Sequence, residues 1–223
     1  MPATYRQRVP RPDDARPGAP APWSARPAAQ RCSIPVSRLR RALAGWTAPP
    51  EPREPVHSAV LVPVVERDGE AALVFIRRAS DLARDPDHIA FPGGHLETGE
   101  RPLEAALRES SEEIGLAPDL VEVVCSLGVI ERGHSRERVA PFVGLVTGRP
   151  CLVGDGREVA AILEVPVASL AGEGISWQEH WGPDGSDRAV RFFAGTPELG
   201  DDLIWGLTAH IVWELLAAVF AET

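Results

Sequence analysis

A glycine-containing loop that leads directly into an acidic helix constrains this chain more than any other feature. Residues 94–101 read GHLETGER, and residues 102–116 read PLEAALRESSEEIGL. Side chains three and four positions apart share one helix face, so Glu109, Glu112 and Glu113 are predicted to point toward one patch of space. The proline that opens this helix and the glycine near its end mark its two boundaries.

The charge of this helix calls for a counter-ion. Two like charges about 4 Å apart repel by up to ~4 kcal/mol at an effective dielectric constant near 20. Favourable pairs on a helix return only ~0.2–0.5 kcal/mol each. Arg108 is the only cation of the helix and cannot neutralise its four glutamates together. Mg²⁺ combines carboxylate oxygens with substrate phosphate oxygens, so the pattern indicates a divalent metal site, with a solvated acidic face as the alternative.

The spacing of these residues resembles the Nudix box. That pattern is Gly, five residues, Glu, seven residues, Arg-Glu, two residues, Glu-Glu, an aliphatic residue, Gly and another aliphatic residue. The chain meets it at Gly94, Glu100, Arg108, Glu109, Glu112, Glu113, Ile114, Gly115 and Leu116. Ser110 departs from it, because the family usually has an aliphatic residue there. Since this position faces the core, the departure is expected to loosen helix packing more than it alters chemistry.

The resemblance implies a Nudix hydrolase, which is an α/β/α sandwich with a mixed central sheet. It implies cleavage, dependent on Mg²⁺ or Mn²⁺, of a nucleoside diphosphate linked to another moiety. The same resemblance places three glutamates around the ions as metal ligands and catalytic residues, with the Gly94 carbonyl as a further ligand: Glu109, Glu112 and Glu113. Glu109 is the first choice for a base that also touches metal.

Supporting roles follow from the same resemblance. Glu100 and Arg108 are expected to form an ion pair that orients the loop. Glu158 is a supplementary ligand or base in one interpretation and a surface residue at a strand edge in the other.

Arginines near the box are the expected phosphate-binding groups, because this acidic protein must bind a polyanion. Arg77 and Arg78 end a predicted strand, and strand alternation lets only one of them face inward easily. Three arginines of a later loop are weaker candidates: Arg132, Arg136 and Arg138. In the glycine loop of the box, the residues expected to approach the substrate are Gly93, Gly94 and His95.

Segments outside the box resemble coenzyme A pyrophosphatases. They are residues 73–78, 81–84 and 91–94, residues 158–160 leading to 165–166, and residues 204–208. Asp85, Asp87 and His88 depart from that subfamily, which usually has His, Gly and then Glu or Gln. The leading hypothesis is hydrolysis of coenzyme A or its derivatives to 3′,5′-ADP and (acyl-)4′-phosphopantetheine. Two alternatives remain open: hydrolysis of ADP-ribose, a dinucleotide or an oxidised nucleotide, and a non-catalytic nucleotide sensor.

Composition narrows the class of protein without selecting it. The chain has 223 residues, of which 44% are hydrophobic, and this suffices for one main domain. All 23 basic residues are arginine, which excludes a Walker A loop and a lysine Schiff base. Three scattered cysteines predict free thiols. No apolar run approaches a membrane span, so the protein is expected to be cytoplasmic, with no membrane partner.

Charge and proline content divide the chain into three parts. Residues 1–55 hold ten arginines against four acidic residues, whereas the remainder holds thirteen against twenty-eight. Residues 1–31 are proline-rich with little apolar content and are predicted to be a disordered arm. Its arginines are interpreted as solvated and not as a nucleic-acid contact. Residues 32–55 are predicted to be a short helix over 36–43 and a linker, and residues 56–223 the Nudix hydrolase domain.

Within this domain the patterns predict a sheet and two helices. Strands are expected at 58–65, 71–76, 121–130, 139–146, 158–165 and 189–193, the first two joined by a hairpin turn at Asp68-Gly69. The helix expected at 203–221 is apolar nearly all round. Deep burial would explain this surface, and so would the interface of a homodimer.

Overall fold

The computed structural model describes residues 5–46, 55–131, 136–182 and 188–221. Its larger sheet has the order β4-β3-β2-β8-β6, with β5 paired to β2, β7 to β8 and β9 to β3. Strands β2 and β8 are parallel and the other neighbours are antiparallel, so the predicted mixed sheet is confirmed. The strands are β2 (Ser58–Arg67), β3 (Glu70–Arg78), β4 (Ile89–Ala90), β5 (Gly93–His95), β6 (Val121–Ser126), β7 (Ile130–Glu131), β8 (Arg138–Val146) and β9 (Val159–Pro166).

The hairpin between β2 and β3 turns at the predicted dipeptide. Arg67 pairs with Glu70, which leaves Asp68 and Gly69 as the two turn residues. Both have positive φ, 51° and 85°, as the tight hairpin turns that match strand twist require.

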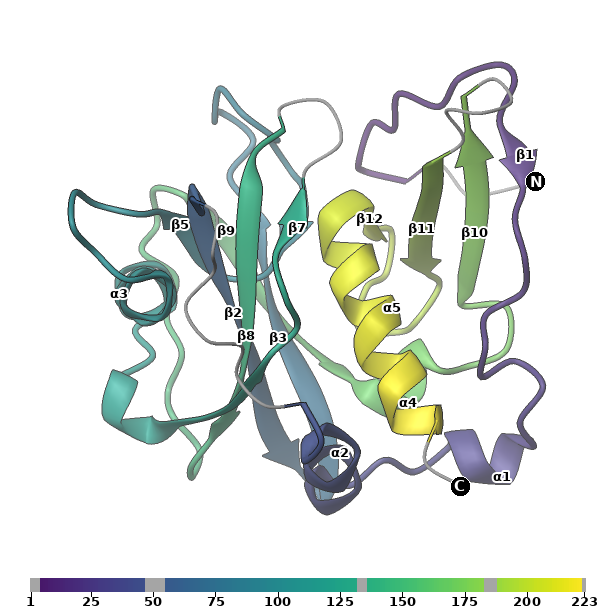
Figure 1. Ribbon diagram of the computed structural model, residues 1–223, viewed down its shortest axis with the longest axis horizontal. Coiled ribbons are helices and arrows are strands. Elements are labelled where there is room, and N and C mark those ends of the chain that lie inside the picture. Colours follow the sequence, from purple (N-terminus) through teal and green to yellow (C-terminus); the bar gives the residue numbers. More distant parts are fainter. Residues whose placement is uncertain (1–4, 47–54, 132–135, 183–187, 222–223) are drawn as a thin grey trace.

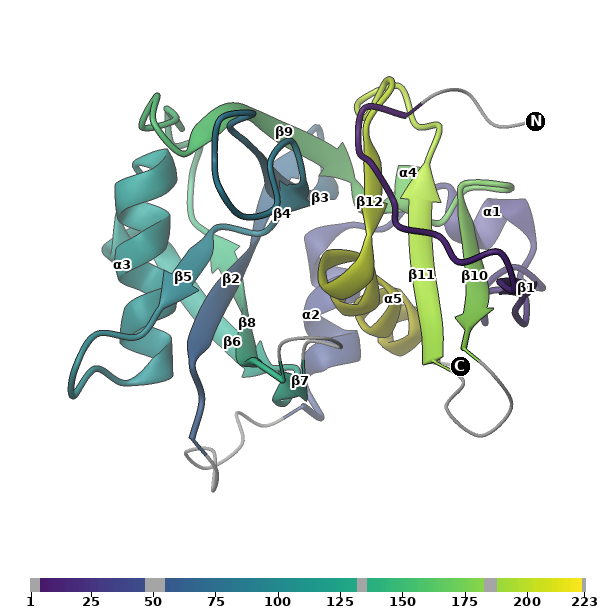
Figure 2. The ribbon, with the colours of Figure 1, turned by 90° about the horizontal axis from the view of Figure 1, so that it is seen from above.

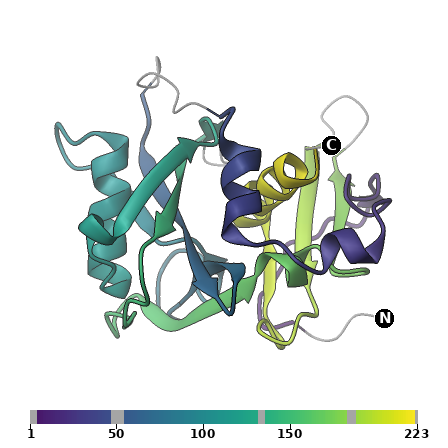
Figure 3. The same cartoon turned by 90° about the horizontal axis from the view of Figure 1, so that it is seen from below.

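Helices cover both faces of the larger sheet. Helix α3 (Pro102–Ile114) packs on one face, and α5 (Gly206–Ala221) and α2 (Val36–Leu43) lie on the other (Figure 1). Figure 3 shows α2 and α5 side by side, and the two helices are in contact. The predicted α/β/α sandwich is therefore confirmed. Shorter helices are α1 (Ala28–Arg31), α4 (Val167–Leu170) and the 3₁₀ turn η1 (Pro118–Leu120).

A second, four-stranded sheet lies beyond α5. Its order is β1 (Arg16–Pro17), β10 (Ser176–Trp181), β11 (Arg188–Ala194) and β12 (Leu203–Trp205). Figure 2 shows α5 between the larger sheet and this smaller one. Ten of the sixteen residues of α5 are buried. Burial within the chain thus accounts for the apolar surface of this helix, and the homodimer stays a prediction.

Two predicted elements differ from the structure by more than one or two residues at their ends. The helix expected from 203 begins at Gly206, because 203–205 form β12, in which Ile204 pairs with Phe193. The strand expected at 121–130 is two strands, since Gly128 adopts a φ of 82° between them. Local apolar patterning revealed neither the pairing of β12 with β11 nor the break between β6 and β7, which both pair with β8.

The prediction of a disordered arm is wrong for residues 5–31. Strand β1 pairs with β10, and the side chain of Trp23 is only 1% exposed. Its ring centroid lies 4.9 Å from that of Trp213 and 6.3 Å from that of Phe193. The segment has few apolar residues, but these residues meet an apolar surface formed by distant parts of the chain, and this burial offsets the entropy of ordering.

Three further predictions concern helix α2 and the linker after it, the cysteines, and membrane-spanning helices. Helix α2 has the predicted bounds, whereas most of the linker that follows it, 47–54, lies outside the described residues. All three cysteines are free thiols, as expected; Cys125 is buried, whereas Cys32 and Cys151 are exposed. Among the described residues, no helix is both long enough and apolar enough to span a membrane.

Candidate active site

Helix α3 presents its acidic side away from the core. Pro102 is its first residue, and Gly115 caps it in the left-handed conformation with a φ of 67°. Ala105, Ala106 and Ser110 are fully buried against the larger sheet. The hydroxyl of Ser110 donates to the Ala106 carbonyl at 2.7 Å, so this position faces the core as predicted, with its polar group satisfied inside the helix.

Two consecutive glycines let the loop lie against the helix carboxylates. The backbone N–H of Gly93 donates to Glu113 Oε2 at 2.9 Å. A Cβ on Gly93 would overlap the Ala59 carbonyl, and a Cβ on Gly94 would overlap the carboxylate of Glu109. These positions require glycine because backbone and carboxylates approach closely, which supports the predicted place of the loop beside the acidic face.

Two carboxylates of this face, Glu109 and Glu113, are destabilised in their charged form. Burial, with the nearby charges of Glu109 and Glu158, raises the pKa of Glu113 to about 8, although the hydrogen bond from Gly93 opposes the shift. Burial also raises the pKa of Glu109, and the charges of Glu112 and Glu158 add to this effect. Four glutamates therefore form one electrostatically coupled group with too little positive charge nearby: Glu109, Glu112, Glu113 and Glu158.

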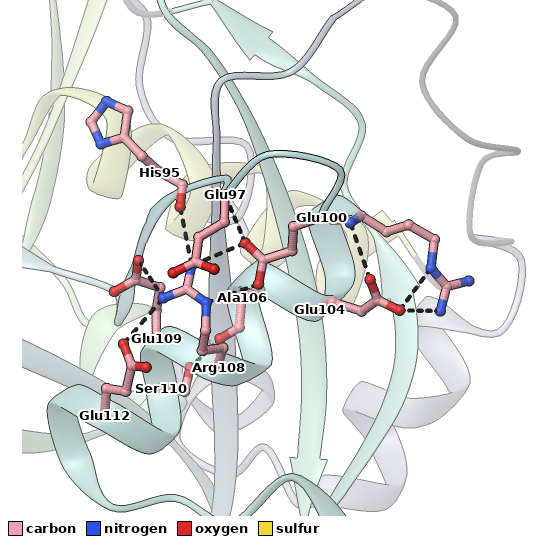
Figure 4. Close-up of polar contacts among 10 residues, drawn as sticks. His95, Glu97, Glu100, Glu104, Ala106, Arg108, Glu109, Ser110 and Glu112 are labelled. Atoms are coloured by element: carbon pink, nitrogen blue, oxygen red, sulfur yellow. Dashed lines mark hydrogen bonds and ion pairs between the residues drawn. The ribbon is translucent and has the colours of Figure 1, made fainter.

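Arg108 organises the exposed side of this group (Figure 4). Its Nε donates to Glu100 Oε1 at 2.8 Å, and its Nη2 donates to the His95 carbonyl at 3.1 Å. The expected ion pair with Glu100 is therefore confirmed, and it ties the loop to the helix. Nη1 lies 3.0 Å from Glu109 Oε1 and 3.1 Å from Glu112 Oε2.

Glu158 joins the group from a different part of the chain. The loop before β9 docks on the end of α3, where Asp155 N–H donates to the Glu113 carbonyl at 3.0 Å. The Asp155 carboxylate accepts the N–H groups of residues 157, 158 and 159 and thereby shapes the turn. This fold places Glu158 within electrostatic reach of Glu109 and Glu113.

The two arginines at the end of β3 diverge. A β-bulge separates them, and the charge of Arg78 acts on Glu113. The Nε of Arg78 is buried and has no hydrogen-bond partner in the described part of the chain. Arg77 instead donates to Asp202 Oδ2 at 3.0 Å. Strand alternation thus leaves Arg78 at the site, and the expectation that Arg77 also binds substrate is not supported by its position.

His95 is held by a carboxylate that the sequence analysis missed. Its Nε2 lies 3.1 Å from Glu137 Oε1, which also accepts a hydrogen bond from the Ser58 hydroxyl. Ser58 and His95 are paired residues of β2 and β5. Glu137 has no fixed spacing from the box. Its one signal in the sequence is its place in the loop of candidate arginines. Arg136 and Arg138 border Glu137, whereas Arg132 lies outside the described residues.

Comparison with known proteins assigns the family. The NUDIX domain model matches residues 55–185. The chain belongs to the Nudix family. It is 32% identical over 164 residues to an uncharacterized Nudix hydrolase, NudL, of Yersinia enterocolitica, spanning 73% of this chain and 81% of the relative. It is 31% identical to the NudL of Yersinia pestis strain Pestoides F, over 73% of this chain and 79% of that one.

A solved structure agrees with the Nudix fold. A MutT/nudix family protein from Enterococcus faecalis superimposes with a TM-score of 0.50 at 18% identity, covering 78% of this chain and 66% of that one. At this identity the likeness concerns the fold alone. It supports the mixed sheet with flanking helices described above.

The residues of the Nudix box fit a divalent ion in their chemistry. They offer hard oxygen ligands, and the pKa of Glu113, raised first by burial and then by the charges of Glu109 and Glu158, marks a carboxylate whose charged form a cation would stabilise. In the segments that the structure describes, no three acidic, His or Cys side chains converge as a ready-made metal-binding group. Arg108 explains part of this arrangement, because it draws Glu109 and Glu112 to its own Nη1. Glu112 is the most exposed of the three, with 61% of its side chain accessible.

Proposed function

We propose that this Nudix hydrolase cleaves the diphosphate of coenzyme A or its derivatives, releasing 3′,5′-ADP and (acyl-)4′-phosphopantetheine. Family membership supports pyrophosphohydrolase chemistry on a nucleotide-derived small molecule. The choice of coenzyme A as the substrate rests on the position of one segment of the chain in the structure. Residues 73–94, which resemble the corresponding part of coenzyme A pyrophosphatases, contribute both Arg78 and Gly93 to the surroundings of Glu113.

Arg78 is the proposed phosphate-binding residue. A buried guanidinium nitrogen without a partner is unfavourable, and an anionic oxygen would satisfy it. Because Arg78 lies within electrostatic reach of Glu113, a phosphate held by its guanidinium would stand next to the carboxylate group. His95, steadied by Glu137, is proposed as a second contact on the exposed side of the loop.

The carboxylates are proposed to hold the metal and to handle the proton. Glu109, Glu112 and Glu113 would bind Mg²⁺ or Mn²⁺, with the Gly94 carbonyl and Glu158 as supplementary ligands. When bound, the ion would screen the charge of the diphosphate and lower the pKa of a coordinated water. Glu109 is the proposed base, because it lies against Gly94 and burial raises its pKa, which favours proton acceptance.

A substrate panel tests this proposal. Purified protein is incubated with Mg²⁺ or Mn²⁺ and coenzyme A, dephospho-coenzyme A, ADP-ribose, NADH or nucleoside triphosphates, and the products are identified by mass. We expect selective cleavage of coenzyme A that stops when a chelator removes the metal. The dephospho compound is the matched control for a contact to the 3′-phosphate.

The other outcomes are equally informative. Survival of coenzyme A together with cleavage of ADP-ribose would refute the substrate and keep the hydrolase. Binding without turnover of any compound would indicate a nucleotide sensor. The intact carboxylates of the Nudix box argue against the sensor, since a binding module has no need to retain them.

A further inference from the structure

A buried glutamine near the amino terminus links three separate parts of the chain. Gln7 is 4% exposed. Its Nε2 donates to the Asp87 carbonyl at 2.8 Å and to Asp202 Oδ1 at 3.0 Å, and its Oε1 accepts the N–H of Leu203 at 2.7 Å. One side chain thus joins the amino-terminal segment to the loop between β3 and β4 and to the start of β12.

The carboxylate at this junction is fully engaged. Asp202 is 3% exposed and pairs with Arg6 at 3.2 Å and with Arg77 at 3.0 Å, in addition to Gln7. A buried carboxylate with such partners is a firm anchor, because releasing one partner leaves charge uncompensated. Gln7 is therefore held from the side of the second sheet while it holds Asp87.

The loop that Gln7 holds, residues 79–88, begins and ends beside the proposed active site. Arg78 N–H donates to the His88 carbonyl at 2.9 Å, and Ala79 N–H donates to the Glu158 carbonyl at 2.8 Å. The side chain of Arg78 also reaches the Arg84 carbonyl at 3.5 Å. Movement of this loop would therefore move the phosphate-binding Arg78, whereas Glu158 is held in addition by the Asp155 carboxylate.

The loop depends on contacts from outside itself. Asp85 and Asp87 have positive φ values of 48° and 61°, which non-glycine residues adopt only at some energetic disadvantage. Next to them, the His88 ring packs edge-on to Trp205 of β12, with centroids 5.3 Å apart. The Gln7 hydrogen bond and the Trp205 contact come from two directions and hold the same end of the loop.

We infer that Gln7 is a positioning residue of this hydrolase, which fixes loop 79–88 so that Arg78 is ready to receive the substrate phosphate. The inference rests on the proposed function for its catalytic consequence. Gln7 contacts the loop and the second sheet and not the helix that carries the metal-binding glutamates. Its loss should therefore weaken substrate binding without changing the chemical step.

The test compares two substitutions in the same amino-terminal segment. Gln7→Ala removes the hydrogen bond to loop 79–88 together with those to Asp202 and Leu203. Arg11→Ala is the matched control, because Arg11 binds Glu179 of β10 at 2.8 Å and lies outside the contacts to the loop described here. For Gln7→Ala we expect KM to rise about fivefold, because only one of the three lost hydrogen bonds reaches the loop, with kcat unchanged within about twofold. Arg11→Ala should leave both constants near their original values.

Amide hydrogen exchange supplies a readout that does not need activity. Residues 79–88 should exchange faster in Gln7→Ala than in the original protein or in Arg11→Ala, while α3 keeps its protection. Equal KM values for Gln7→Ala and the original protein, or equal effects of the two substitutions, would overturn the inference. A fall in kcat matched by loss of α3 protection would also overturn it, since this result would show a general structural role.

The experiments also allow for a Gln7→Ala variant that does not fold and for an original protein that cleaves none of the compounds. If Gln7→Ala does not fold, Gln7→Glu replaces it, because the carboxylate keeps the size of the side chain but cannot donate to Asp87 and repels Asp202. If the original protein cleaves no compound of the panel, the proposed function has failed. The exchange comparison alone then decides whether Gln7 positions the loop.

Discussion

At the scale of single residues, the helix carboxylates and the glycines opposite them depend on one another. Glu113 is 4% exposed and accepts the Gly93 N–H, and Glu109 fills the space beside Gly94. A side chain on either glycine would displace what lies opposite. The two glycines nevertheless face different neighbours, one a backbone carbonyl and the other a flexible carboxylate, so their substitution should have separable effects.

Replacing Glu113 by Gln is expected to abolish most turnover while the fold persists. The amide keeps the volume and can still accept the Gly93 N–H through its oxygen, but it lacks the charge that a metal requires. Turnover with Mg²⁺ and thermal unfolding would be measured together. An unchanged rate would remove Glu113 from the metal-binding group.

Alanine at the two glycines should affect different properties. In Gly93→Ala the new Cβ meets the Ala59 carbonyl, and the backbone φ of 153° is unfavourable for alanine, so we expect a loss of stability of about 1–3 kcal/mol. In Gly94→Ala the three atoms nearest to the Cβ all belong to the Glu109 carboxylate, which can rotate away. This variant should keep its melting temperature and lose activity.

Denaturant unfolding and turnover measured on both variants check this contrast. The interpretation of the Gly94 contact would be incorrect if Gly94→Ala were as destabilised as Gly93→Ala. Full activity in Gly94→Ala would show that the position of Glu109 does not matter for turnover.

At the scale of elements, α3 combines a buried small-residue face with an acidic face that runs from buried Glu113 to exposed Glu112. Its boundaries follow from local chemistry, because Pro102 suits the first turn and Gly115 ends it. The serine in its core face is unusual for the Nudix box. Its hydroxyl bonds within its own helix, to a carbonyl four residues earlier, so it adds no contact between elements.

Ser110→Ala is therefore expected to be neutral or to stabilise the protein by up to about 0.5 kcal/mol. Alanine has the higher helix propensity, and the lost hydrogen bond ends on a carbonyl of the same helix. Chemical denaturation measures the change, with turnover as the control for an intact site. A loss of stability above about 1 kcal/mol would show that the hydroxyl bond is a net stabilising contact.

At the scale of the whole molecule, the amino-terminal segment packs against the carboxyl-terminal helix and the second sheet. Trp23 packs against rings of β11 and α5, and Arg31 Nη1 donates to the Ala171 carbonyl at 2.8 Å. The segment that holds Gln7 is thus anchored at several points along its length, and it supplies the edge strand β1 of the second sheet.

Trp23→Ala should destabilise the protein by about 3–5 kcal/mol, which is the usual effect of truncating a fully buried tryptophan. A disordered arm would show no such effect. Unfolding monitored by circular dichroism gives the measurement, and Trp177→Ala, in which a partly exposed ring is lost, is the control expected to cost less. A change below about 0.5 kcal/mol for Trp23→Ala would contradict the packing described here.

Local sequence was sufficient wherever a few neighbouring residues decide the geometry. The Asp68-Gly69 turn, the bounds of α2 and α3, and the acidic face with its Glu100–Arg108 pair were predictable for this reason. Tertiary structure alone decided the rest. It brought Glu158 and Glu137 to the box, turned Arg77 away from it, converted residues 203–205 into a strand and ordered residues 5–31. Each of these outcomes depends on a partner far away in the sequence, and hydrophobic burial and charge compensation act between neighbours in space whatever their separation along the chain.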